Sequence, residues 1–124
     1  MSENYKVVGT SAYKQLLADP QGADVIAVPV ASGAGDIEIG TLLFRDASGS
    51  YKPAAAADVT STKSLVVAKE TIESGDDAGS VVDAGAYRAG SFVDGAVKLK
   101  DGTAVTAEQK VTLRLQNIVF DVMD

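Results

Sequence analysis

The stretch Val25–Pro53, VIAVPVASGAGDIEIGTLLFRDASGSYKP, contains the pattern that decides the fold. Its apolar residues favour β-structure, and its interruptions, SGAGD and DASGS, are turn-forming sequences. The alternation that begins at residue 37 places Ile37 and Ile39 on one face of a strand and Glu38 on the other. The DASGS turn then leads back through YKPA, so the stretch predicts a β-hairpin.

Further strands are predicted at residues 24–31, 63–72 and 81–93. Pro29 favours an edge position or a strand end, because proline cannot donate a hydrogen bond to a neighbouring strand. Gly85 and Gly90 lie inside the last of these runs and predict a bulge, a bend or a close backbone contact. Asp-Gly pairs at 94–95 and 101–102 predict two further turns.

The C-terminal stretch, residues 103–124, carries two competing patterns. VTLRL alternates as a strand does, but Thr106 and Gln109 have the spacing of a helix capping box. A helix would also gather three apolar residues on one face: Val111, Leu115 and Ile118. We therefore favour a helix that ends at Asn117 in the left-handed conformation, with an extended segment after it.

The first 24 residues differ from the rest of the chain. YKVVGT predicts a short strand, and SAYKQLLADP predicts one or two helical turns before Asp19-Pro20. Their apolar area is too small for independent folding. We therefore divide the chain into an N-terminal arm, residues 1–24, and a β-rich domain, residues 25–124. The arm is expected to be flexible, and it either packs on the domain or becomes ordered on a partner.

Composition limits both the fold and the function. With 124 residues, 46% of them hydrophobic, the chain predicts a small single domain. The strand and helix patterns described above make this domain mainly β, with one or two short helices. There are no cysteines and no histidines. This excludes disulfides and thiolate metal sites, and it removes the commonest general base and zinc ligand. We expect a protein that is not an enzyme, with no catalytic, cofactor-binding or metal-binding residues.

The charge pattern bears on partners and location. The net charge is −6, and the 11 basic residues are scattered singly, which argues against direct binding of nucleic acid. No apolar run approaches the roughly 18 residues of a membrane-spanning helix. The opening MSENYKVVGT lacks the basic and apolar regions of a signal peptide. We expect a protein that is made in the cytoplasm, stays soluble and has no membrane partner.

Two loops and one strand contain candidate site residues. The loop ESGDDAGS is acidic, but Glu73, Asp76 and Asp77 lack the spacing of a calcium loop, which favours a solvated turn. ASGAG is not followed by the Gly-Lys-Ser/Thr of a phosphate-binding loop. Tyr87 and Arg88 are predicted interface residues, because both types are enriched at binding hot spots. An ordinary strand with one solvent-facing charge is the alternative.

Taken together, four segments resemble the head decoration proteins of lambda-type bacteriophages in their order and spacing. The segments are VASGAGDIEIGTLLF, GSYKPAA, LVVAKETIESGDDAGSVVDAGAYRAGSFV and TAEQKVTLRLQNIVFDV. The resemblance begins at about Val25 and runs to the C-terminus. It departs from the family at Asn117, where glycine is usual, and at Arg88-Ala89-Gly90, where the family often has Arg-Gly.

The resemblance implies a structural protein of the virion that needs no cofactor. It implies homotrimers on the outer surface of the expanded icosahedral capsid, where they brace the shell against the pressure of the DNA inside. The N-terminal arm would then contact the major capsid protein. We expect strand addition to carry that contact, with capsid-binding residues in the short β-type run: Tyr5, Lys6, Val7 and Val8.

Other readings stay open beside the resemblance. The chain could be another structural phage component, such as part of a tail tube, a baseplate or a head fibre. It could also be a small ligand-binding or carbohydrate-binding β-module, which would need exposed aromatic side chains in a cleft. An unusual enzyme would need two carboxylates in a deep pocket.

Overall fold

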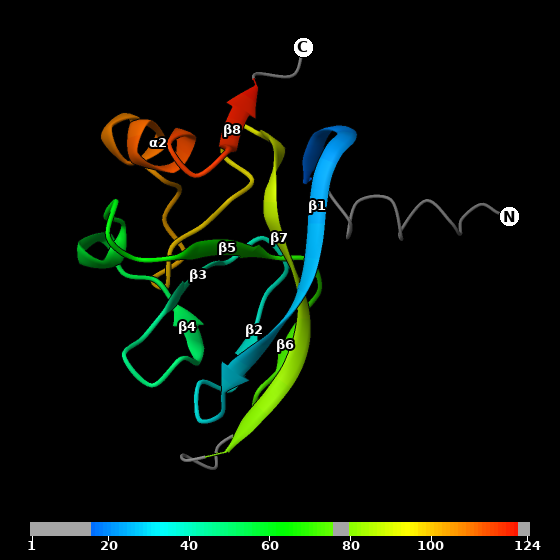
Figure 1. Cartoon of the computed structure of the whole chain (residues 1–124), viewed down its shortest axis with the longest axis vertical. Coiled ribbons are helices and arrows are strands. Elements are labelled where there is room, and N and C mark those ends of the chain that lie inside the picture. Colours follow the sequence, from blue (N-terminus) through cyan, green and yellow to red (C-terminus); the bar gives the residue numbers. More distant parts are fainter. Residues whose placement is uncertain (1–15, 76–79, 122–124) are drawn as a thin grey trace, which may run out of the picture.

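The computed structural model describes residues 16–75 and 80–121 (Figure 1). The structure is mainly β, which confirms the predicted fold class. The strands are β1 (Leu17–Ala31), β2 (Asp36–Ile37), β3 (Leu42–Arg45), β4 (Tyr51–Pro53), β5 (Leu65–Ala68), β6 (Ile72–Glu73), β7 (Val81–Val93) and β8 (Ile118–Asp121). Between them lie a 3₁₀ turn (Ala56–Asp58) and the helix α2 (Ala107–Arg114).

The main sheet closes on itself. Its strand order is β1-β4-β3-β5-β7-β8, and β7 also pairs antiparallel with β1. β1, β4, β3, β5 and β7 therefore form a small barrel, which leaves fewer strand edges open than a flat sheet does. β8 lies outside this ring as a parallel extension of β7. β2 and β6 form a separate two-residue ladder.

β1 and β7 form a long ribbon that runs the length of the domain, with α2 and β8 at one end (Figure 1). The bounds of β7 are those predicted from the sequence, residues 81–93. Asp24 pairs with Ala89 and Asp19 with Ser91, so residues 20–23 form a bulge in β1 opposite Gly90. The N–H of Gly90 turns to the other side and donates to the carbonyl of Asn117, 3.0 Å away. The irregularity predicted from the glycines is therefore confirmed at Gly90.

The predicted boundary between arm and domain, after residue 24, lies inside β1. Leu17 pairs with Phe92, and both Leu16 and Leu17 pack against the core. Residues 17–19 are extended rather than helical, because β7 supplies a hydrogen-bonding partner for their backbone. Residues 16–24 therefore belong to the β-domain. The remainder of the predicted arm, residues 1–15, lies outside the described residues.

The hydrophobic core has two clusters, separated by β3 and β5. Both strands are buried on both faces, so Leu43 and Val66 point into the barrel while Leu42 and Val67 point to the opposite side. The cluster outside the barrel, which contains Leu42 and Val67, is covered by α2, β8 and the loops that contain Val97, Leu99 and Val105. This arrangement explains why β5 reads as the continuous apolar run LVVA rather than as an alternating pattern.

The C-terminal helix forms as predicted, but its buried face is different. The Thr106 hydroxyl accepts from the Gln109 N–H, the Gln109 side chain accepts from the Thr106 N–H, and Asn117 has φ +66°. Of the residues predicted to share one apolar face, Val111 and Leu115 are 67% and 72% exposed and Ile118 is buried, whereas the side of the helix that faces the core carries Leu113. Tertiary contacts of the last helical turn set this rotation, and they are described below.

The alternation predicted at the start of β3 is also interrupted. Ile37 is buried, but Ile39 is 40% exposed. A turn at residues 39–40 separates β2 from β3, and Gly40 has φ +89°.

No helix within the described residues is long and apolar enough to span a membrane.

Candidate functional site

The outward side of the β1–β7 ribbon is a mostly apolar surface, here called the ribbon face: Val25, Ala27, Pro29, Val81, Asp83 and Gly85. It is exposed except at Gly85, which is half-buried under the side chains of Lys69 and Glu70. Residues paired across an antiparallel ladder point to the same side, and Ala27 pairs with Gly85. The alternate residues of both strands point into the barrel core. Val25 and Val81 are 47% and 54% exposed. An exposed apolar sheet surface built from small side chains is typical of a protein contact site.

Tyr87, a predicted interface residue, borders the ribbon face. It pairs with Val25 across the ladder and therefore lies on the same side of the ribbon. Its ring is half-buried and packs edge-on against Phe92, with 5.7 Å between the centroids and 71° between the planes. Tyr87 therefore borders the exposed ribbon face and also packs against the core cluster that contains Phe92.

Arg88, the other predicted interface residue, lies at the margin of the same ribbon. Its Nε donates to the carboxylate of Asp24, 2.8 Å away, and its terminal nitrogen forms an ion pair with the same carboxylate. Because both side chains are exposed, the pair contributes at most about 1 kcal/mol to stability. The predicted capsid-binding residues lie outside the described residues: Tyr5, Lys6, Val7 and Val8.

A second feature is a wide, open groove of about 1030 Å³. Its walls come from the segment between β1 and β3, from β3 and β4, from the 3₁₀ turn and from the loop after Val97. Both signs of charge line it: Asp36, Glu38, Asp58 and Asp101 together with Lys52, Lys98 and Lys100. The groove is therefore polar and charged at its rim.

Two carboxylates of the groove hold local backbone structure. The pKa of Asp101 is lowered because the hydroxyl and the N–H of Thr103 donate to its side chain. Burial alone would raise the pKa of Asp58, but hydrogen bonds from Lys63 and from the Ala55 N–H outweigh burial and lower it. A general acid or base needs a pKa near the working pH, so both groups suit turn stabilisation better than proton transfer.

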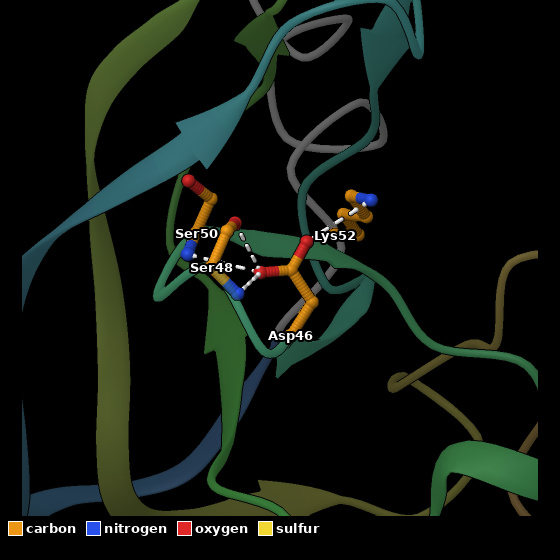
Figure 2. A network of polar contacts seen from close by, with 4 residues as sticks. All are labelled: Asp46, Ser48, Ser50 and Lys52. Atoms are coloured by element: carbon orange, nitrogen blue, oxygen red, sulfur yellow. Dashed lines mark hydrogen bonds and ion pairs between the residues drawn. The ribbon is translucent and has the colours of Figure 1, made fainter. Parts of the chain in front are cut away.

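Lys52, on the groove wall, is tied to the β3–β4 hairpin by Asp46 (Figure 2). One Asp46 oxygen accepts from the N–H and the hydroxyl of Ser48 and from the N–H of Ser50, at 2.9, 2.6 and 3.2 Å. The other lies 3.0 Å from Lys52 Nζ. The Ser48 hydroxyl and then Lys52 are the main causes of a strongly lowered pKa for Asp46. This network confirms the turn predicted from DASGS, with Gly49 at φ +93°.

Within the described residues, no three acidic side chains gather as a metal site would require. Of the acidic loop ESGDDAGS, Glu73 lies in β6, whereas Asp76 and Asp77 lie outside the described residues. Comparison with known proteins adds no further assignment: no protein-family model matches the chain, and no curated protein is similar to it.

Sequence reasoning reached one end of the ribbon face, at Tyr87 and Arg88, but missed the rest of it. Tyr87 and Arg88 stood out by residue type, whereas Val25 and Val81 are ordinary strand residues whose exposure depends on what packs over them. The period-2 pattern of β1 and β7 could have indicated this outward face. The groove left no local signal, because its walls come together from distant segments.

Proposed function

We propose that this protein is a capsid decoration protein of the lambda type. It binds as trimers to the outer surface of an expanded icosahedral capsid and stabilises the shell. The proposal rests on the resemblance of four ordered segments to that family, and the fold is compatible with it. In the structure these segments form one small β-domain whose first strand continues directly from the N-terminal arm.

The ribbon face is the observation on the domain that best supports a binding role. It offers a mostly apolar contact surface on the two longest strands of the described residues. β1 carries half of this surface and also continues the arm, so one strand connects the two predicted contact regions. We propose that the arm and the ribbon face both contribute to attachment.

Such a protein stabilises its target by mass action. A ligand that binds the expanded shell and not its dissociated subunits shifts the equilibrium toward the intact shell. A shell offers many identical sites, so individually modest contacts add up over the whole particle. This mechanism needs surface complementarity rather than catalytic groups.

Co-sedimentation with capsids tests the proposal. Purified protein is mixed with unexpanded and with expanded shells of the phage that encodes it, both lacking this protein. We expect saturable binding to expanded shells, in a copy number divisible by three. Absence of binding to either shell would contradict the proposal.

The groove favours a second candidate, a small ligand-binding β-module. Its volume and its charges of both signs could accommodate a small polar ligand. A ligand screen by NMR distinguishes the candidates, because such a module would show shifts confined to groove residues such as Lys98 and Lys100. Self-assembly of the purified protein into rings or fibres would instead favour a tail, baseplate or head-fibre component.

A further inference from the structure

The groove follows the main chain of β2 and not only its side chains. All the residues from Asp36 to Ile39 line it. Side chains alternate between the two sides of a strand, so a wall made by one side would involve only every second residue. Ile37 lines the groove although its side chain is only 3% exposed. One edge of β2 therefore forms part of the groove wall.

The hydrogen-bond pattern of β2 shows which backbone groups this edge carries. Pairs across an antiparallel ladder alternate between hydrogen-bonded and non-hydrogen-bonded. Ile37 is the residue of β2 that bonds to β6, because the bond from the Ser74 N–H to the Gly35 carbonyl fixes the alternation. The backbone groups of Asp36 and Glu38 therefore point away from β6, along the outer edge of β2.

Three of these groups have no hydrogen-bond partner among the described residues: the N–H and the carbonyl of Asp36 and the N–H of Glu38. The Glu38 carbonyl is occupied, since it accepts from the N–H and the hydroxyl of Thr41. On the β4 wall, the Pro53 carbonyl points away from β3, because the adjacent bond of that ladder is donated by the Ala54 N–H. Open strand edges of this kind accept a further strand.

The charges beside the β2 edge favour a basic partner. Asp36 and Glu38 are exposed and form no ion pair with any other described residue. Lys98 and Lys100 belong to a different segment of the wall, so the side chains directly across the ladder set the preference. Several other charged residues of the groove already have partners within the fold: Lys52, Asp58 and Asp101. The net charge of −6 also attracts a basic segment.

We propose that the groove binds an extended segment of another polypeptide chain by strand addition to β2. The free groups of Asp36 and Glu38 lie two residues apart, about 7 Å along the edge, which matches the repeat of an extended chain. Backbone hydrogen bonds to these two residues provide the pairing, and basic side chains opposite them provide the preference. This site is separate from the ribbon face, and its binding does not depend on attachment to a capsid.

An NMR titration of the isotope-labelled full-length chain tests the proposal. The probe is a hexapeptide with blocked ends in which threonine and lysine alternate. We expect saturable shifts that are largest at the amides of Asp36 and Glu38, with a Kd of about 1 mM. The same peptide with glutamate in place of lysine should bind at least about tenfold more weakly. Absence of shifts at both amides would overturn the proposal, and equal binding of the two peptides would overturn the basic preference.

Backbone methylation of the probe tests strand addition itself. Methylating the backbone nitrogens of the lysines removes the N–H groups that pair with β2 and keeps every charge, so binding should be lost. Equal binding of the methylated and unmethylated peptides would overturn the proposal. This comparison leaves the protein unchanged and so does not depend on the folding of any variant.

A matched pair of variants repeats the test from the side of the protein. Asp36→Pro removes an N–H that makes no bond to β6, whereas Asp36→Ala removes the charge and keeps the N–H. D36P should bind the lysine peptide several-fold more weakly than D36A. Glu38→Pro and Glu38→Ala form a second such pair, with the melting temperature as the check on folding. Equal binding within both pairs would overturn the proposal.

Discussion

The Gln116 side chain bonds to the backbone at the start of β5 in the way a neighbouring strand would. Its Oε1 accepts from the N–H of Leu65 at 3.0 Å, and its Nε2 donates to the carbonyl of Lys63 at 2.8 Å. The amide thus pairs two groups of an extended segment and connects the end of α2 to the main sheet. These bonds, together with Leu113, set the rotation of the helix.

Replacing Gln116 by alanine should lower the free energy of unfolding by about 1–3 kcal/mol, because a buried donor and acceptor lose their partners. Urea denaturation measures the change. Arg114→Ala, two residues away and exposed, is the control and should cost less than about 0.5 kcal/mol. Equal costs for the two variants would contradict the assigned role of Gln116.

The helix rotation predicts opposite outcomes for two nearby leucines. Leu113→Ala removes a fully buried side chain and should cost about 2–5 kcal/mol of stability. Leu115→Ala removes an exposed one and should change stability by less than about 0.5 kcal/mol. Thermal denaturation of the two variants measures both stability losses. A larger loss for L115A than for L113A would contradict the rotation of the helix in the structure.

Leu113 and Leu115 show which part of the helix structure local sequence patterns could not predict. The capping box and Asn117 are local signals, and the structure confirms the Thr106 cap and the left-handed Asn117, although the helix ends at Arg114 rather than at Asn117. The side that faces the core depends on Gln116 meeting Leu65, a contact between residues far apart in the chain. Local apolar spacing therefore predicted that a helix forms but not how it is rotated.

The strands show the same division. β7 was predicted with its observed bounds because the loop ESGDDAGS and the turn at Asp94-Gly95 flank the run. The start of β1 was missed because Leu17 is extended through its pairing with Phe92, which no nearby residue signals. Among the site residues, Tyr87 and Arg88 were singled out by type. The outward direction of Val25 and Val81 follows from the alternation of their strands, but their exposure depends on which segments pack over them in the folded domain.

Acid should destabilise the fold through the turn carboxylates. The pKa of Asp46 in the folded protein is lowered from 3.8, mainly by the Ser48 hydroxyl and Lys52. A lowered folded pKa means that the stabilisation is complete above the unfolded pKa and is lost as the pH falls through the folded pKa. We therefore expect the melting temperature to fall below about pH 4, and Asp46→Asn to weaken this dependence.

Melting curves recorded between about pH 6 and pH 2 measure this effect. Asp83→Asn, on the exposed ribbon face, is the matched control and should leave the acid dependence close to that of the wild type. If D46N and D83N changed the curve equally, the Asp46 network would not be the source of the effect.

The ribbon face should be needed for capsid binding but not for folding. Val25→Asp combined with Val81→Asp places charge on an apolar contact surface and should weaken binding to expanded shells at least about tenfold, or roughly 1.4 kcal/mol per site. The control combines Ser61→Asp with Thr71→Asp, which adds the same charge at exposed positions elsewhere. Quantitative co-sedimentation compares the two, with melting temperature as the check on folding. Equal binding by both variants would show that the ribbon face does not contribute to capsid binding.

Electron cryomicroscopy of expanded capsids saturated with the purified protein tests the central claim most directly. The account predicts density for this domain on the outer surface of the shell, in groups of three around three-fold and quasi-three-fold positions. Shells without added density, or density confined to a tail or vertex, would contradict the assignment as a decoration protein.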